Sequence, residues 1–278
     1  MNDYDLISNE GYKDSADFVV VSNTTFDFNI LKKDAIIFCK TDYIDFLFEN
    51  IKFSNKKYVL ITHYSDYYVD KVKFSKKPNC IKKWYAWAVL YKHEDLIPIP
   101  VGFSIFWDIK GVKHEDYLDY FYNNLERLKL VEKDNKTVYC NFTVDHLRPP
   151  RHQVVNKILA NNVKCYVPPD GHTENGRMTF PDYCEDMAKF KFVASPFGNG
   201  GDSHRTWDAV YMKCIPIVQK NLYKSFDLPI LEINDFSEVT NKLLEDYLEY
   251  YNTHEFKYEQ STLSYWINRM REDLKNKL

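Results

Sequence analysis

Short apolar runs alternate with longer amphipathic segments along most of the 278-residue chain. These runs include DFVVVS (17–22), AIIFCK (35–40), KYVLITH (57–63), FVASP (192–196) and CIPIVQ (214–219). Apolar runs of this length, separated by helix-like segments, are typical of parallel strands joined by crossover helices. The sequence therefore predicts an α/β fold.

The length of the chain and a fresh start of the pattern near residue 136 indicate two structural units. We expect a first domain over residues 1–135, a second over 136–260, and a C-terminal helix over 261–278 that could pack back on the first domain. Two α/β units in one chain leave a cleft between them, where small ligands usually bind.

Composition excludes several classes of protein. The net charge is −3 and no basic stripe is visible, which argues against a nucleic-acid partner. The six cysteines show no CxxC pair, so reduced, buried thiols are expected rather than a metal site. No apolar stretch reaches the roughly 18 residues of a membrane helix. We expect a soluble, cytoplasmic protein, and the sequence leaves its oligomeric state open.

The segment GNGGDSHRTWD (198–208) follows an apolar run and opens a helix-like segment. Glycines let the backbone approach a ligand, and the first turn of a helix offers free N–H groups at the positive end of its dipole. We therefore expect a diphosphate here, although Arg205 and Asp208 could instead form a surface ion pair one turn apart. The candidate ligand-binding residues are Gly198, Asn199, Gly200, Asp202, Ser203, His204 and Arg205, with Asp208 for ribose hydroxyls.

The longer segment YCEDMAKFKFVASPFGNGGDSHRTWDAVYMKCIPIV (183–218) closely resembles the carboxyl-terminal motif of exostosin-like glycosyltransferases, glycosyltransferase family 47 and its relatives. Weaker similarity reaches upstream to about residue 58, through YVLITHYSD, KKWYAW, IPIPVGF and VYCNFTVDHLRPPRHQV. Asp208 departs from the family, which more often has Glu there. In its residues and small size the chain is most similar to compact members from large DNA viruses of the chlorovirus type.

The resemblance implies a GT-B-type fold, with two Rossmann-like domains whose parallel sheets face each other across a cleft. It implies that a nucleotide-sugar donor binds the second domain and an acceptor the first. It also implies transfer with inversion and without a metal or other cofactor. Arg151 matches the arginine of the family best and is expected at the diphosphate, and Asn141 and Arg148 in the same segment are further candidates.

An inverting transfer needs a general base that takes the proton of the acceptor hydroxyl. The segment ITHYSDYY (61–68) ends a first-domain strand and offers Asp66 as the first candidate and His63 as the second. Asp145 and His146 are alternative candidates for the base. Asp66 could instead have a purely structural role, as the cap of the turn that follows it. The aromatic segment KKWYAW (82–87) is expected to be either a core helix or a platform for sugar rings.

These features predict an inverting glycosyltransferase that moves a sugar from a UDP-sugar to an oligosaccharide or glycoprotein acceptor, as in viral glycan synthesis. UDP-xylose is the first expectation for the donor, and GDP-fucose and other UDP-sugars stay open. One alternative is a catalytically inactive relative that binds nucleotide-sugar or glycan. A nucleotide-dependent kinase is the other alternative, but the chain lacks a GxxxxGK[ST] phosphate loop.

Overall fold

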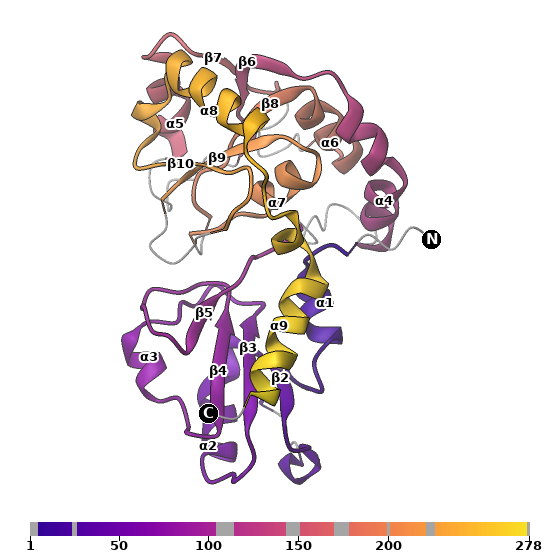
Figure 1. Ribbon diagram of the computed structural model, residues 1–278, viewed down its shortest axis with the longest axis vertical. Helices are drawn as coiled ribbons and strands as arrows, with labels where there is room; N and C mark the ends of the chain where they lie inside the picture. Colours follow the sequence, from indigo (N-terminus) through magenta and orange to yellow (C-terminus); the bar gives the residue numbers. More distant parts are fainter. Residues whose placement is uncertain are drawn as a thin grey trace.

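A computed structural model of the chain describes residues 5–23, 27–103, 114–142, 151–169, 178–198, 201–220 and 226–276. It contains two five-stranded sheets, and every strand pair in both is parallel. The two sheets belong to separate domains of the molecule, one above the other in Figure 1. The expected α/β class with two parallel sheets is confirmed, in the arrangement expected of a GT-B-type fold.

The first sheet pairs its strands in chain order: β1 (Phe18–Val20), β2 (Ala35–Lys40), β3 (Tyr58–His63), β4 (Ile81–Ala86) and β5 (Leu96–Pro98). Two helices cover each face: α2 (Ile44–Ile51) and α3 (Lys71–Ser75) on one, α1 (Asn9–Asp14) and α9 (Leu263–Lys275) on the other. Helix α9 therefore crosses back from the second domain to cover the first sheet (Figure 1).

The strand β2 shows why the first sheet needs helices on both sides. Ile36 and Phe38 pack in the cluster that contains α9, whereas Ile37 and Cys39 pack in the cluster that contains α2. Successive side chains of a strand point to opposite faces, so a strand buried on both sides is a continuous apolar run. The run AIIFCK has this pattern, and its bounds agree with the predicted strand.

Helix α9 is held to the first sheet by polar contacts as well as by packing. The Nζ of Lys82 on β4 donates to the carbonyls of Leu274 and Asn276, both at 3.0 Å. Arg271 forms an ion pair with Asp17, whose carboxylate also accepts the N–H of Ile36 at 2.8 Å. Lysine at a helix C-terminus stabilises the last carbonyls and the negative end of the dipole.

The second sheet has the order β10-β9-β8-β6-β7. Its strands are β6 (Asp134–Tyr139), β7 (Lys164–Tyr166), β8 (Phe190–Ala194), β9 (Ile215–Gln219) and β10 (Leu231–Ile233). The helices α5 (Arg151–Leu159) and α8 (Asn241–Thr253) cover one face, and α4 (His114–Leu130), α6 (Phe180–Ala188) and α7 (His204–Tyr211) the other. The chain leaves β6 toward β7 and leaves β8 toward β9, in opposite directions, so the topological switch point of the sheet lies between the ends of β6 and β8.

Three segments differ from the expectations. Helix α4 packs against α6, so residues 114–130 lie with the second domain rather than the first. The segment KKWYAW forms strand β4 instead of a helix, with Trp84 and Tyr85 fully buried. Four short 3₁₀ helices complete the described elements: η1 (Phe28–Ile30), η2 (Thr41–Tyr43), η3 (Phe236–Glu238) and η4 (Tyr258–Ser261).

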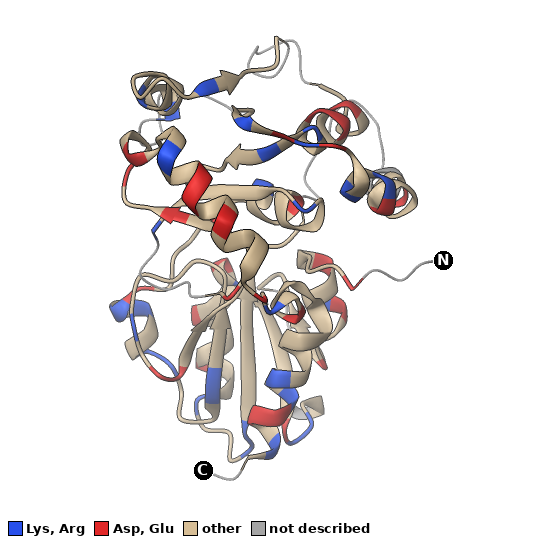
Figure 2. Cartoon of the chain, turned by 45° about the horizontal axis from the view of Figure 1, so that its top comes forward, with Lys and Arg blue, Asp and Glu red and all other residues tan. Residues whose placement is uncertain are grey.

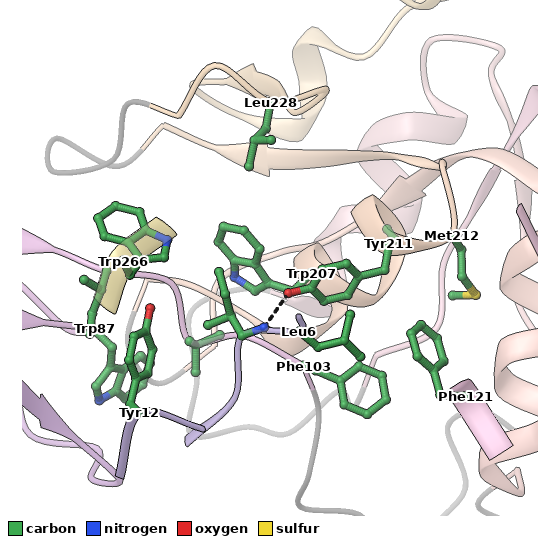
Figure 3. Packing of buried hydrophobic residues seen from close by; sticks show 14 of the residues in the cluster. Leu6, Tyr12, Trp87, Phe103, Phe121, Trp207, Tyr211, Met212, Leu228 and Trp266 are labelled. Carbon is green, nitrogen blue, oxygen red and sulfur yellow. Dashed lines mark hydrogen bonds between the residues drawn. The ribbon is translucent and has the colours of Figure 1, made fainter. Parts of the chain in front are cut away.

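One apolar cluster runs through the junction of the two domains (Figure 3). Beside this cluster, the Ile7 N–H donates to the hydroxyl of Tyr211 at 2.9 Å, and the Ile7 carbonyl accepts the N–H of Phe103 at 2.7 Å. A side chain at Gly102 would bring its Cβ to 2.4 Å from the same carbonyl, and φ there is +78°, so glycine is required. The domains therefore meet in a packed junction.

Charges are mixed over the surface. Figure 2 shows Lys and Arg interspersed with Asp and Glu on both domains, without a basic stripe over the described residues in that view. No helix in the described ranges is both long and apolar enough to cross a membrane.

Candidate functional site

The carboxyl edge of the second sheet gathers most of the predicted ligand-binding residues. Asn141 follows β6, and the loop that starts at Ser195 follows β8. Helix α5 begins at Arg151 and helix α7 at His204, each after one of these two strands. In parallel α/β sheets ligands bind at this edge, at the point where the direction of the connections reverses. The switch point between β6 and β8 is therefore the candidate donor site.

Arg205 is the cationic side chain that best suggests anion binding at this switch point. Its guanidinium lies over the ring of Phe142, with Cζ 5.6 Å from the ring centroid. The Nε and Nη1 atoms are buried, and neither has a hydrogen-bond partner among the described residues. Buried donors are normally paired, and guanidinium groups bind phosphate through two parallel hydrogen bonds. Arg205 is therefore a candidate for binding a phosphate at the end of β6.

Asp208 is buried in the second domain and does not lie at the surface. It is 1% exposed, and its Oδ2 accepts a hydrogen bond from the hydroxyl of Tyr183 on α6 at 3.0 Å. The surface ion pair considered for Arg205 and Asp208 is therefore wrong. A ribose contact would require Tyr183 to release this carboxylate. Asn141 is also buried, and its amide donates to the hydroxyl of Tyr139 at 2.9 Å.

Asp202 has a different role from the predicted one. Its Oδ2 accepts the N–H of Val101 at 2.9 Å and the indole N–H of Trp207 at 3.0 Å, and its Oδ1 accepts the N–H of Ser203 at 2.8 Å. Because these donors occupy the carboxylate, Asp202 ties α7 to the chain segment that leaves the first domain. It is not a ligand of an anionic diphosphate.

The start of α7 still offers N–H groups. Ser203 is the N-cap residue, and its side chain accepts no capping hydrogen bond. The first N–H groups of a helix have no partner within the helix, so an uncapped start favours a bound anion. Ser203 therefore remains a candidate at the diphosphate.

His204, a candidate ligand-binding residue, is a neutral side chain at the junction of the domains. Its Nδ1 lies 2.8 Å from the carbonyl oxygen of Gly102 and must donate its proton there. Burial lowers the pKa of the imidazole, so the ring is neutral at pH 7. The ring lines a cavity between the domains.

Arg151 and Gly198 shape the loop after β8. The Nε and Nη2 of Arg151 donate to the carbonyl of Phe197 at 2.9 and 2.8 Å. A Cβ on Gly198 would lie 2.8 Å from the carbonyl oxygen of Asp202, so the loop closes tightly here. Arg151, expected at the diphosphate, thus supports the loop. The remaining candidates lie outside the described residues: Asp145, His146, Arg148, Asn199 and Gly200.

The carboxyl edge of the first sheet faces the second domain across a cavity of about 490 Å³. Both candidate bases, His63 and Asp66, line this cavity together with His204 of α7. The other lining residues come from the ends of β2 and β4, from α1 and from the junction: Asn9, Lys40, Asp42, Tyr64, Ser65, Tyr67, Trp87 and Val101. The cavity therefore joins the first domain to the helix of the candidate donor site.

The two candidate bases differ in their hydrogen bonding. The Nδ1 of His63 accepts the N–H of Tyr64 at 2.8 Å, so in the neutral ring the proton is on Nε2 and the basic nitrogen is occupied. Asp66 is exposed at the rim of the cavity, rather than shielded by tyrosines. Burial and the Asp66 charge raise the pKa of Tyr68, which places this hydroxyl near the carboxylate. The geometry favours Asp66.

The loop that carries these residues is strained. Tyr64 has φ of +67°, a conformation that non-glycine residues rarely adopt, and its hydroxyl donates to Glu10 on α1 at 2.6 Å. Such outliers cost about 1–3 kcal/mol and cluster at functional sites. The strain supports a functional role for the end of β3.

Two groups of residues lining cavities were not predicted from the sequence. A second, narrow pocket lies beside the start of α7, and Gln219 from the end of β9 and Glu232 on β10 line it. Polar residues at the ends of apolar strands could have indicated it. Asn9 lines the interdomain cavity from α1, where the polar sequence gave no such signal. No group of three or more His, Cys, Asp or Glu in the described ranges is placed to hold a metal ion.

Comparisons with known proteins add little to this geometry. No protein-family model matches the chain, and no curated protein matches it in sequence. Among solved structures, a crystal structure of an α1,3-fucosyltransferase is similar with a TM-score of 0.41 and 12% identity, over 87% of this chain and 78% of that one. A likeness this distant decides neither fold nor activity, and membership of the exostosin-like family stays a prediction.

Proposed function

We propose that this protein is an inverting glycosyltransferase that moves a sugar from a nucleotide-sugar to a hydroxyl group of a glycan. The observation that carries the proposal is the guanidinium of Arg205 at the end of β6, whose buried Nε and Nη1 have no hydrogen-bond partner among the described residues. A departing diphosphate develops negative charge, and a fixed cation beside an uncapped helix start stabilises it without reorganisation.

The reaction follows from the positions of the two sites. An acceptor hydroxyl in the interdomain cavity gives its proton to the carboxylate of Asp66. The hydroxyl oxygen attacks the anomeric carbon and forms the new glycosidic bond. The bond from that carbon to the diphosphate breaks, and the diphosphate leaves with the electron pair toward Arg205 and the N-terminus of α7. Attack opposite the leaving group inverts the anomeric carbon.

The finer assignments rest on the resemblance of residues 183–218 to exostosin-like transferases. They are a UDP-sugar donor, with UDP-xylose as the first candidate, and a role in assembling glycans on a viral glycoprotein. The mechanism needs no metal ion or other cofactor, because Arg205 and the helix dipole supply the positive charge that a metal would otherwise bring.

A nucleotide panel tests the proposal. UDP, UDP-xylose, UDP-glucose, GDP and GDP-fucose are compared by thermal shift and by hydrolysis or transfer in the presence of EDTA. We expect one nucleotide to raise the melting temperature, because a ligand that binds only the folded state stabilises it. Arg205→Gln should weaken the binding of that nucleotide about 10- to 100-fold, because it removes one or two charge-assisted hydrogen bonds.

Arg127→Gln is the matched control, since Arg127 lies on α4 in an exposed ion pair with Glu185. It should leave nucleotide affinity unchanged. The proposal fails if no nucleotide binds, or if Arg205→Gln binds as tightly as the unmodified protein.

A further inference from the structure

Asn9 places a polar side chain without a partner in the wall of the interdomain cavity. The residue is 2% exposed, and its Oδ1 is buried without a hydrogen-bond partner among the described residues. The same side chain lines the cavity that contains Asp66 and His204. Buried amide groups are nearly always paired, and an unpaired one destabilises the fold. An amide kept in this state points to a ligand.

The segment around Asn9 is fixed to both domains. Ile7 bonds to Tyr211 of α7 through its N–H and to the N–H of Phe103 through its carbonyl. Ser8 caps α1, with its Oγ accepting the N–H of Gly11 at 2.9 Å. The carboxylate of Glu10 accepts a hydrogen bond from the hydroxyl of Tyr64, in the loop that carries the candidate base Asp66. The amide of Asn9 is therefore held in a set position between α7 and the end of β3.

We propose that Asn9 binds the acceptor: its Oδ1 accepts a hydrogen bond from the hydroxyl of the acceptor sugar that neighbours the attacking one. This inference rests on the proposed function and names a residue of its acceptor site. A terminal amide offers an acceptor at one end and donors at the other, and a sugar hydroxyl can pair with either. Asn9 would thereby set which hydroxyl of the sugar reaches Asp66.

The walls of the cavity indicate a neutral sugar. The Nζ of Lys40 lies 3.6 Å from Oδ2 of Asp42, so these two charges compensate each other. The charge of Asp66 would repel a carboxylate on the acceptor. Trp87 lines the cavity and stacks on His63, with 5.7 Å between ring centroids, and gives an aromatic wall for the apolar face of a sugar ring. A cavity of about 490 Å³ lies within the range of small-molecule binding sites and has room for a sugar ring.

Asn9→Leu tests the proposal, because leucine has the same branched arrangement of side-chain heavy atoms as asparagine and no polar atom. We expect an unchanged or higher melting temperature, since the substitution removes an unpaired buried amide. The acceptor KM should rise, and the ratio of transfer to donor hydrolysis should fall about tenfold, as the loss of one hydrogen bond implies. Asn50→Leu is the control: Asn50 is exposed on α2 and bonds only to the carbonyl of Phe46 among the described residues.

The outcomes separate this inference from the proposed function. A lower melting temperature, or an equal loss of hydrolysis and transfer in Asn9→Leu, would show a structural role and overturn the proposal. If the unmodified protein neither hydrolyses nor transfers any donor, the proposed function fails instead.

Acceptor binding can then be measured without catalysis. Saturation-transfer NMR with methyl β-D-xylopyranoside, cellobiose and methyl β-D-glucuronide reports which sugars the protein contacts. The proposal predicts contacts to a neutral sugar that Asn50→Leu keeps and Asn9→Leu loses. Equal contacts in both variants, or a preference for the glucuronide, would refute it.

Discussion

The carboxyl edges of the two sheets form binding sites in different ways. In the second sheet the order β10-β9-β8-β6-β7 reverses direction between β6 and β8, so the switch point lies within one domain. In the first sheet the strands follow chain order and no reversal occurs. Its cavity is closed instead by α1 and by His204 from the other domain. The proposed donor site therefore belongs to one domain, whereas the acceptor site requires both.

Asp66→Asn should separate the two sites most strongly. An amide cannot take the proton of the acceptor hydroxyl, so we expect transfer to fall about 100-fold or more while nucleotide affinity stays the same. Initial rates and thermal shifts with the donor measure the two effects. Asp70→Asn is a suitable control, because Asp70 caps α3 and asparagine also caps helices well. Near-normal transfer by Asp66→Asn would place the base elsewhere.

Asp202→Ala should break the connection between the two sites. It removes the acceptor of the Val101 and Trp207 N–H groups, and both donors become buried and unpaired. We expect a loss of about 2–4 kcal/mol in the free energy of unfolding, measured by chemical denaturation.

Asp246→Ala, in an exposed pair with Lys242 on α8, should cost no more than about 0.5 kcal/mol. If Asp202→Ala is equally mild, Asp202 does not hold the junction together.

His204 should make the junction sensitive to acid, by the smallest of these effects. Burial lowers its folded-state pKa, opposed by the carbonyl of Gly102 and the charge of Asp202, while Arg205 lowers it further. The unfolded chain takes up a proton near pH 6.5 and the folded protein only at lower pH. The stability is therefore complete above about pH 6.5 and declines below it, by at most about 1.4 kcal/mol per pH unit.

His204→Asn keeps a donor for Gly102 and does not titrate. Melting temperatures between pH 7.5 and 5 should fall less steeply for this variant than for the unmodified protein. Parallel curves would mean that His204 keeps its ordinary pKa in the folded state.

Local features of the fold could be predicted from the sequence, and distant pairings could not. The strand AIIFCK and the strand–loop–helix order around residue 198 depend on neighbouring residues, and the structure agrees with them. The partner of Asp202 lies 101 residues away and that of His204 102 residues away. Residue type gave their chemistry, but only the fold decides whether that chemistry faces a ligand or the junction.

Helix α4 and Asn9 show the same limit. The sequence of α4 indicates a helix, but its apolar face fits either domain, and only its packing against α6 decides between them. Asn9 lies in a polar segment where an asparagine carries no signal. Its position became informative only when the cavity and its buried oxygen were known.

Helix α9 makes the order of synthesis matter. One face of the first sheet, with Ile36, Phe38 and Tyr85, is covered by a helix that follows the whole second domain in the chain. On the ribosome α1 alone is available to cover this face while about 160 further residues are added after β5. The first domain is thus completed last, and a nonsense mutation just before α9 would damage the half of the molecule made first.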